Sequence, residues 1–137
     1  MIGSAEVVRC FVEDYHEKLE EEYIFPRFRS AGKEIELVET LVAQHRSGRV
    51  LTDAILMRAN RNALQNSEEG EKLMVALHLF VRMYRPHAAR EDTVLFPQLR
   101  SVVSRHEFDA LGEEFEDKEH ELFGQDGFRS VVASCRL

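Results

Sequence analysis

The 137-residue sequence predicts an all-α fold, an up-and-down helical bundle. Apolar residues recur at intervals of three and four over long stretches, which places them on one face of a helix. Seven glycines and three prolines are too few for a turn-rich β fold. A hydrophobic content of 44% can supply a core, and the length suits one unit, so we expect residues 1–137 to form a single domain.

The apolar spacing and its interruptions predict four long helices and one short one. Ser4 is a suitable N-cap for the first helix, which should end or kink close to Pro26 because proline cannot continue the hydrogen-bond ladder. Pro86 lies inside the third helix, where a proline costs about 3 kcal/mol, so we expect a kink there. The polar residues 66–70 should form the loop before that helix. The expected helices cover residues 5–25, 34–64, 71–96, 99–103 and 107–123.

A His-x-x-x-Glu motif occurs twice, and both copies are followed by Phe-Pro at the same distance. Residues four apart lie on one face of a helix, so each copy stacks an imidazole over a carboxylate. One such motif arises often by chance, but two copies offset by 71 residues with the same Phe-Pro are hard to attribute to chance. The matching residues are His16, Glu20, Phe25 and Pro26 in the first copy and His87, Glu91, Phe96 and Pro97 in the second.

Imidazoles and carboxylates together suit non-haem iron, and also zinc or manganese. A helical bundle can hold two such ions when facing helices direct ligands inward. The second helix offers a third imidazole, since His45 follows Leu41 by four residues on the apolar face. Buried carboxylates beside imidazoles are costly without a neutralising cation. We therefore predict a site for two transition-metal ions, formed by His16, Glu20, His45, His87 and Glu91.

Each of these residues taken alone has a simpler interpretation. His45 could be a hydrogen-bonded core residue, and His16 with Glu20 could be a solvated pair on a helix surface. The repeated motif together with His45 favours the metal site over these interpretations.

The other histidines are expected to play smaller parts. His78 precedes His87 by nine residues, which places it on the opposite helix face. His106 stands at the start of the last helix and should be a surface or capping group. His120 follows Glu116 by four residues, so it is either an exposed residue of an acidic helix or a further ligand.

Composition excludes several classes of function. A net charge of −7 argues against a general nucleic-acid binder. No apolar run approaches the ~18 residues that span a bilayer, and the N-terminus lacks the pattern of a signal peptide. Cys10 and Cys135 form neither a disulfide framework nor a metal knuckle. We expect a soluble cytoplasmic protein without nucleic-acid or membrane partners.

The chain resembles the hemerythrin-like family, also called HHE cation-binding domains. The similarity rests on the stretch from His16 to Pro26, on Gln44 with His45, and on the stretch from His87 to Pro97. It implies an antiparallel four-helix bundle with a non-haem di-iron centre. It also implies that the five residues named above are the ligands, with Glu20 and Glu91 bridging the ions. Family members bind dioxygen, respond to oxygen, nitric oxide or iron, or handle iron.

Two departures from the family pattern stand out. The family's first helix, with its own histidine ligand, has no counterpart in the 15 residues before His16, so we expect a bundle incomplete at the N-terminus, from a natural truncation or a fragment. The middle helix has Leu41 and His45 where oxygen carriers have two histidines. Either the last helix fills the open side and brings His120 or Glu116 to the metal, or two chains pair. We favour the homodimer.

The residues and the resemblance together are compatible with three functions. The first is a di-iron protein that binds or senses dioxygen or nitric oxide, with Tyr15 or Tyr84 as hydrogen-bond donors near the ligand. The second is an iron-handling or iron-sensing module whose metal occupancy controls folding. The third is a metal-free helical interaction domain. We expect binding or sensing rather than catalysis, and the residues alone do not select among iron, zinc and manganese.

Overall fold

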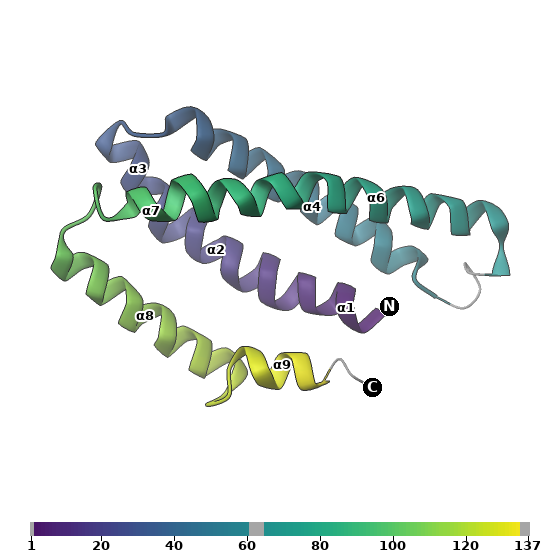
Figure 1. Ribbon diagram of the computed structural model, residues 1–137. Helices are drawn as coiled ribbons and strands as arrows, with labels where there is room; N and C mark the ends of the chain where they lie inside the picture. Colours follow the sequence, from purple (N-terminus) through teal and green to yellow (C-terminus); the bar gives the residue numbers. More distant parts are fainter. Residues whose placement is uncertain (1, 61–64, 135–137) are drawn as a thin grey trace.

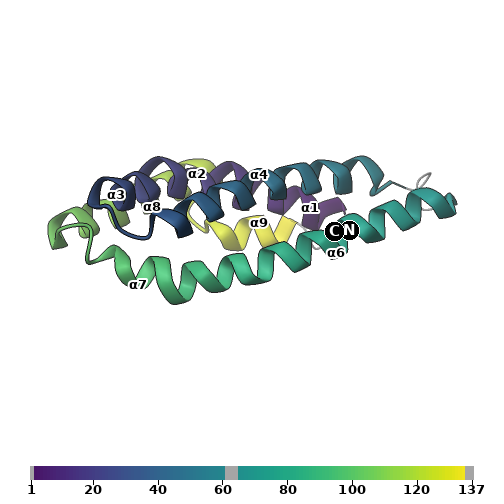
Figure 2. The ribbon, with the colours of Figure 1, turned by 90° about the horizontal axis from the view of Figure 1, so that it is seen from above.

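The computed structural model describes residues 2–60 and 65–134, and every regular element in these ranges is helical. Four long helical segments run in alternating directions (Figure 1), which confirms the predicted all-α, up-and-down bundle. Figure 2 shows the second and third segments side by side. The four segments cover residues 2–31, 35–58, 67–99 and 105–123.

The first segment is one continuous helix that changes its winding. Wider π-helical turns, in which each N–H bonds five residues back, alternate with α-helix. Of the two outcomes expected at Pro26, an end or a kink, the structure excludes the end, because Pro26 occupies the first turn of an α-helical stretch that follows a π-helical one. Gly32, at φ 65°, ends the segment instead. Its elements are α1 (Ile2–Val7), η1 (Val8–His16), α2 (Glu17–Leu19), η2 (Glu20–Ile24) and α3 (Phe25–Ala31).

The second segment is α4 (Ile35–Arg58), shorter than the predicted 34–64. Residues 61–64 of that prediction lie outside the described residues. The third segment begins with α6 (Ser67–Arg90), four residues earlier than predicted. The Asn66 side chain accepts hydrogen bonds from the first backbone N–H groups of α6, which makes Asn66 an N-cap rather than part of a loop.

The third segment repeats the backbone of the first. Helix α6 runs through Pro86, and the change in winding comes later, at the π-helical η3 (Glu91–Leu95), before α7 (Phe96–Leu99). Both η2 and η3 begin at the glutamate of a His-x-x-x-Glu motif and end just before Phe-Pro. The two copies of the motif, 71 residues apart, therefore share a backbone conformation as well as a set of residues. The predicted short helix at 99–103 is wrong, since 100–103 form turns.

The last long helix, α8 (Arg105–Phe123), covers the open side of the first segment, and α9 (Phe128–Ser134) follows it (Figure 1). The Tyr15 hydroxyl donates to the backbone carbonyl of Phe115 at 2.9 Å, and Arg27 Nε lies 2.8 Å from Glu107 Oε1. The last helix thus fills the open side, as the first of the two alternatives predicted. It does not bring His120 or Glu116 to the site, because both are exposed.

The core is divided into two apolar clusters with a polar layer between them. One cluster, around Phe25, Phe28 and Leu41, lies near the α3 end of the bundle, and a smaller one, around Ile55 and Leu73, lies near the other end. Between them are buried glutamates and histidines. None of the described helices combines the length and apolar character required to cross a membrane.

Candidate metal centre

The polar layer is buried as deeply as the apolar clusters beside it. Its side chains come from η1, α2, η2, α4, α6 and η3, and each is at most 5% exposed. Several buried carboxylates without compensation would cost several kcal/mol. The layer consists of Glu13, Glu17, Glu20, His45, Thr52, His87 and Glu91.

Two buried imidazoles are held in matching orientations. Nδ1 of His45 lies 2.8 Å from Glu21 Oε1, and Nδ1 of His87 lies 3.0 Å from Gln44 Oε1. The two rings have centroids 4.9 Å apart. Because each Nδ1 is already engaged, each imidazole presents Nε2 to the interior, which is how protein metal sites orient their histidines.

Both Nε2 atoms meet the carboxylates of the repeated motif. His87 Nε2 is 2.8 Å from Glu91 Oε1, while His45 Nε2 is 3.4 Å from Glu20 Oε2 and 3.8 Å from Glu91 Oε1. His16 approaches from the rim, with Nε2 3.1 Å from Glu20 Oε1. Its side chain is 44% exposed, so this side of the cluster is open.

The structure brings all five residues of the predicted site together. Potential ligand atoms of His45, His87 and Glu91 lie within 4.8 Å of one another, and those of His16, Glu20 and Glu91 do the same. The two groups share Glu91. This arrangement offers two adjacent positions for cations, with one carboxylate common to both.

The donor set fits a metal because its inner atoms lack other partners. Both carboxylate oxygens of Glu20, Oε1 of Glu91 and Nε2 of His45 are buried without a hydrogen bond of acceptable geometry. Native proteins rarely leave such atoms unsatisfied, and clusters of them call for an explanation. A cation bound between these atoms would satisfy all four.

The electrostatics of the cluster favour positive charge. Burial lowers the pKa of His45, but the carboxylates of Glu20 and Glu91 outweigh it and raise the pKa to about 10. Burial likewise opposes ionisation of Glu91, yet His45 and His87 outweigh it and lower the pKa of Glu91 to about 2. The cluster therefore holds the Glu91 carboxylate ionised in the interior, as a cation site requires.

Sequence reasoning missed three members of the layer, Glu13, Glu17 and Thr52. The expected α-helix places Glu17 beyond the apolar stripe, but Glu17 is fully buried. The π-helical η1 turns the chain less per residue than an α-helix, so the buried face drifts along this segment. Burial raises the pKa of Glu17 to about 7, and a carboxylate oxygen of Glu17 lies within 4.8 Å of ligand atoms of Glu21 and His45. In the sequence, only the spacing of Glu13, Glu17 and Glu21 by four residues could have indicated that these glutamates share one helix face.

Arginines partly balance these additional carboxylates. Arg49 Nη2 lies 3.0 Å from Glu17 Oε2 and 3.0 Å from Glu21 Oε1. Arg9 Nη1 lies 3.0 Å from Glu13 Oε2. The arginine side chains are about one-quarter exposed, so they join the buried layer to solvent.

The Glu13 side chain leads to a prediction about pH. Burial raises the pKa of Glu13, although hydrogen bonding from Thr52 and the charge of Arg9 oppose the increase. The pKa of Glu13 is therefore higher in the folded chain than in the unfolded chain. The contribution of protonated Glu13 to folding stability is complete below the unfolded-state pKa, and it is lost as pH rises through the folded-state pKa. We expect the stability of Glu13→Gln, relative to that of the original protein, to be greater at pH 8 than at pH 5. Urea denaturation in the presence of EDTA at both pH values measures this gain.

The exposed Glu22 provides the control for that measurement. Glu22→Gln, on the same helical segment, should shift stability equally at both pH values. A Glu13→Gln protein that loses stability relative to the original as pH rises would contradict a destabilising buried charge at Glu13.

The two tyrosines suggested as donors have different surroundings. Tyr15 donates its hydroxyl to Phe115 and so holds α8 in place. Tyr84 lies beside the centre, with its ring centroid 5.2 Å from that of His87. Burial and then the nearby carboxylates raise the pKa of Tyr84, which keeps its hydroxyl protonated. Tyr84 is therefore the better-placed donor.

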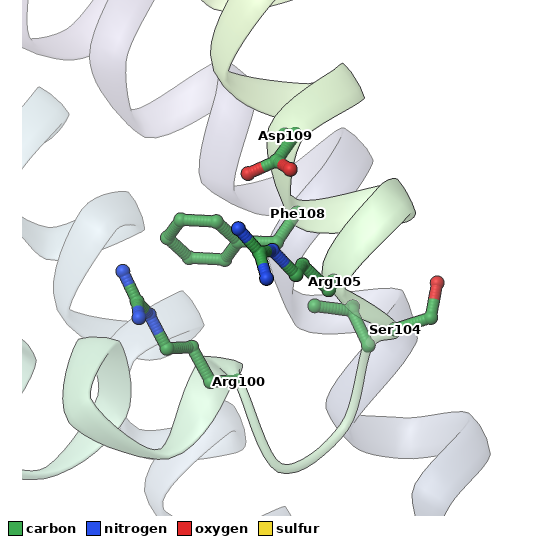
Figure 3. Close-up of a pocket in the computed structure, with 6 residues that line it drawn as sticks. Arg100, Ser104, Arg105, Phe108 and Asp109 are labelled. Atoms are coloured by element: carbon green, nitrogen blue, oxygen red, sulfur yellow. The ribbon is translucent and has the colours of Figure 1, made fainter.

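The exposure of the His78 and His106 side chains agrees with the smaller parts expected of them. His78 is exposed on α6, as expected for the face opposite His87, and His106 is exposed next to Ser104, the N-cap of α8. A cavity of about 360 Å³ lies at this helix start (Figure 3), where Arg100 stacks 4.6 Å from the Phe108 ring centre. No residue of the predicted metal site lines it, so it is separate from the metal centre.

Comparison with known proteins places these features in a family. The family described as Hemerythrin HHE cation binding domain matches residues 4–99 and again 36–126. Uncharacterized proteins of Mycobacterium tuberculosis strain H37Rv and Mycobacterium bovis are each 46% identical over 129 residues, covering 94% of this chain. The chain spans about half (51%) of the length of these relatives, and no solved structure matches it. With most of its length matched by the family model, the chain belongs to the hemerythrin HHE cation-binding domain family.

Proposed function

We propose that the chain binds two iron ions between His16, Glu20, His45, His87 and Glu91, with Glu20 and Glu91 as shared ligands. The observation that carries this proposal is the paired orientation of His45 and His87. Each Nδ1 is occupied by a neighbouring side chain, and each Nε2 faces buried carboxylate oxygens. Mixed imidazole and carboxylate donors suit iron, and zinc and manganese are the competing ions.

The small ligand that we propose is dioxygen or nitric oxide. Ferrous iron at such a centre supplies an electron-rich site that binds diatomic gases. The chain's own contribution is geometric. Glu21 and Gln44 fix the imidazoles, Tyr84 keeps a protonated hydroxyl beside His87, and the half-exposed His16 marks the accessible side. We also propose that the protein acts in the cytoplasm. A homodimer would need another surface, because α8 already covers the side that a second copy was expected to fill.

A second candidate, iron handling or iron sensing, is supported by the cost of the metal-free layer. Glu17, Glu20 and Glu91 have buried oxygens without hydrogen-bond partners. A cation that neutralises them stabilises the folded state, so metal occupancy and folding are coupled. In an iron sensor of this kind, the folded state of the chain would report that iron is bound.

Anaerobic loading with ferrous iron tests both candidates. We expect close to two iron ions per chain by elemental analysis, and fewer than about 0.2 would contradict a metal centre of this donor set. A visible absorption band that appears with dioxygen or nitric oxide supports gas binding. Metal-dependent folding without such a band supports the iron-handling candidate, and a stable fold without iron supports the metal-free interaction domain. Competition with zinc and manganese identifies the preferred ion, and light scattering measures the oligomeric state.

A further inference from the structure

An apolar cavity opens beside the metal centre, between the first segment, α7 and α8. Its volume is about 320 Å³, and it is lined by apolar side chains apart from His16 and Glu20. Phe96 of α7 and Phe115 of α8 form part of the wall, and Leu19 contributes from the first segment. The cavity therefore has one polar end, next to candidate metal ligands, and an apolar remainder.

The cavity exists because α8 is held against the first segment at points on either side of it. Toward one end of α8, Arg27 pairs with Glu107. Toward the other, the rings of Phe11 and Phe123 have centroids 5.2 Å apart. Between these contacts α8 places Gly112 in the wall, and a Cβ atom built at Gly112 would meet nothing within 4 Å. A larger side chain therefore has room at this exposed position of the cavity wall.

The size of the cavity exceeds what a diatomic gas needs. An apolar cavity of roughly 150 Å³ holds one benzene ring, so this one has room for about two fused rings. An uncharged molecule suits the walls, because a charge against apolar side chains would lose its hydration without compensation. A single polar group can be satisfied at the end formed by His16 and Glu20.

We propose that this cavity binds an uncharged, apolar organic molecule of about two-ring size that carries one hydrogen-bonding group, with that group against His16 and Glu20. Such a molecule differs in class from the diatomic ligand proposed above. Its binding requires the cavity and does not need iron. Iron held by His16 and Glu20 would compete with its polar group, so binding to the metal-free chain tests the cavity proposal by itself.

Titration of the full chain with 2-naphthol, followed by calorimetry, tests the proposal. We expect saturable binding of one molecule per chain with EDTA, and weaker binding after iron loading, because iron then engages His16 and Glu20. Naphthalene-2-sulfonate has the same rings with a permanent charge and should bind at least about tenfold more weakly. Absence of saturable 2-naphthol binding to the folded chain, or equal binding of the sulfonate, would overturn the proposal.

Gly112→Phe places a ring in the cavity and should weaken 2-naphthol binding by about tenfold or more. Gly70→Phe is the matched control, since Gly70 is also helical with open space at its Cβ position but lies in the first turn of α6. It should leave the affinity within about twofold. Both changes replace glycine by a residue with a higher helix propensity. If the phenylalanine ring prevents folding, Gly112→Leu can replace Gly112→Phe in the same titration. If the folded Gly112 variant bound 2-naphthol as tightly as the original chain, 2-naphthol would not occupy this cavity and the proposal would be wrong.

The iron content of the same variants separates the two proposals. Gly112→Phe should keep the iron content of the original chain while it loses 2-naphthol. A chain that binds 2-naphthol but not iron would refute the metal centre alone. A chain that binds iron but not 2-naphthol would refute the cavity proposal alone.

Discussion

Glu91→Gln is expected to remove most of the iron from the chain, leaving less than about 0.5 ion per chain after anaerobic loading, because Glu91 belongs to both ligand groups. Glu20→Gln should have a similar effect, since both Glu20 oxygens are buried beside the candidate imidazole ligands His16 and His45. Ligand binding at a hundredfold excess over its dissociation constant stabilises a fold by ~2.7 kcal/mol, and the variants should lose a stabilisation of that order. Elemental analysis and thermal denaturation with and without iron measure both effects.

His78→Ala is the control for this experiment. His78 is exposed on α6, the same helix that carries His87, so its loss should change neither iron content nor iron-dependent stability. If His78→Ala emptied the chain of iron while Glu91→Gln kept it, the assignment of the centre to the polar layer would be wrong.

Phe25→Ala is expected to reduce the free energy of unfolding by about 3–5 kcal/mol, the usual cost of deleting a buried aromatic ring. Phe25 is completely buried, and its ring stacks on His45 with centroids 5.5 Å apart. The substitution therefore leaves a void in the larger apolar cluster and removes one support of a candidate ligand. Chemical denaturation gives the change in stability, and iron content after loading reports the effect on His45.

The second copy of the motif supplies a matched comparison. Phe96 occupies the position equivalent to Phe25, but it is only half-buried and lines the apolar cavity. Phe96→Ala should therefore cost clearly less stability than Phe25→Ala. Equal losses for the two variants would show that burial does not distinguish the two copies of the repeat.

The helical elements were predictable because apolar spacing reports the face that each helix buries. The sequence placed four long helices nearly correctly, and it identified five polar residues that the fold brings together. Among the boundaries that differ from the prediction, three have local reasons. Pro26 follows a π-helical turn that accommodates it, Asn66 caps a helix rather than continuing a loop, and residues 100–103 form turns.

The finer structure of the site was not predictable from an α-helical periodicity. Glu17 is buried because η1 shifts the helix face, and no residue pattern announced that shift. The carboxylate of Glu21 lies within hydrogen-bond distance of Nδ1 of His45 on α4. Such contacts depend on how two segments are aligned in space. The spacing within one segment carries no information about that alignment.

The division of the core into two apolar clusters has a consequence for folding cooperativity. Each end of the bundle has its own hydrophobic stabilisation, and the two ends are joined through a layer of buried charge. Repulsion among carboxylates in that layer weakens the coupling between the ends, whereas neutralisation strengthens it. Chains with a neutralised layer should therefore unfold in one steep transition, while chains with a charged layer should melt in broader steps that begin in the middle of the bundle. The charge of the polar layer thus sets whether the two ends of the bundle unfold together or one after the other.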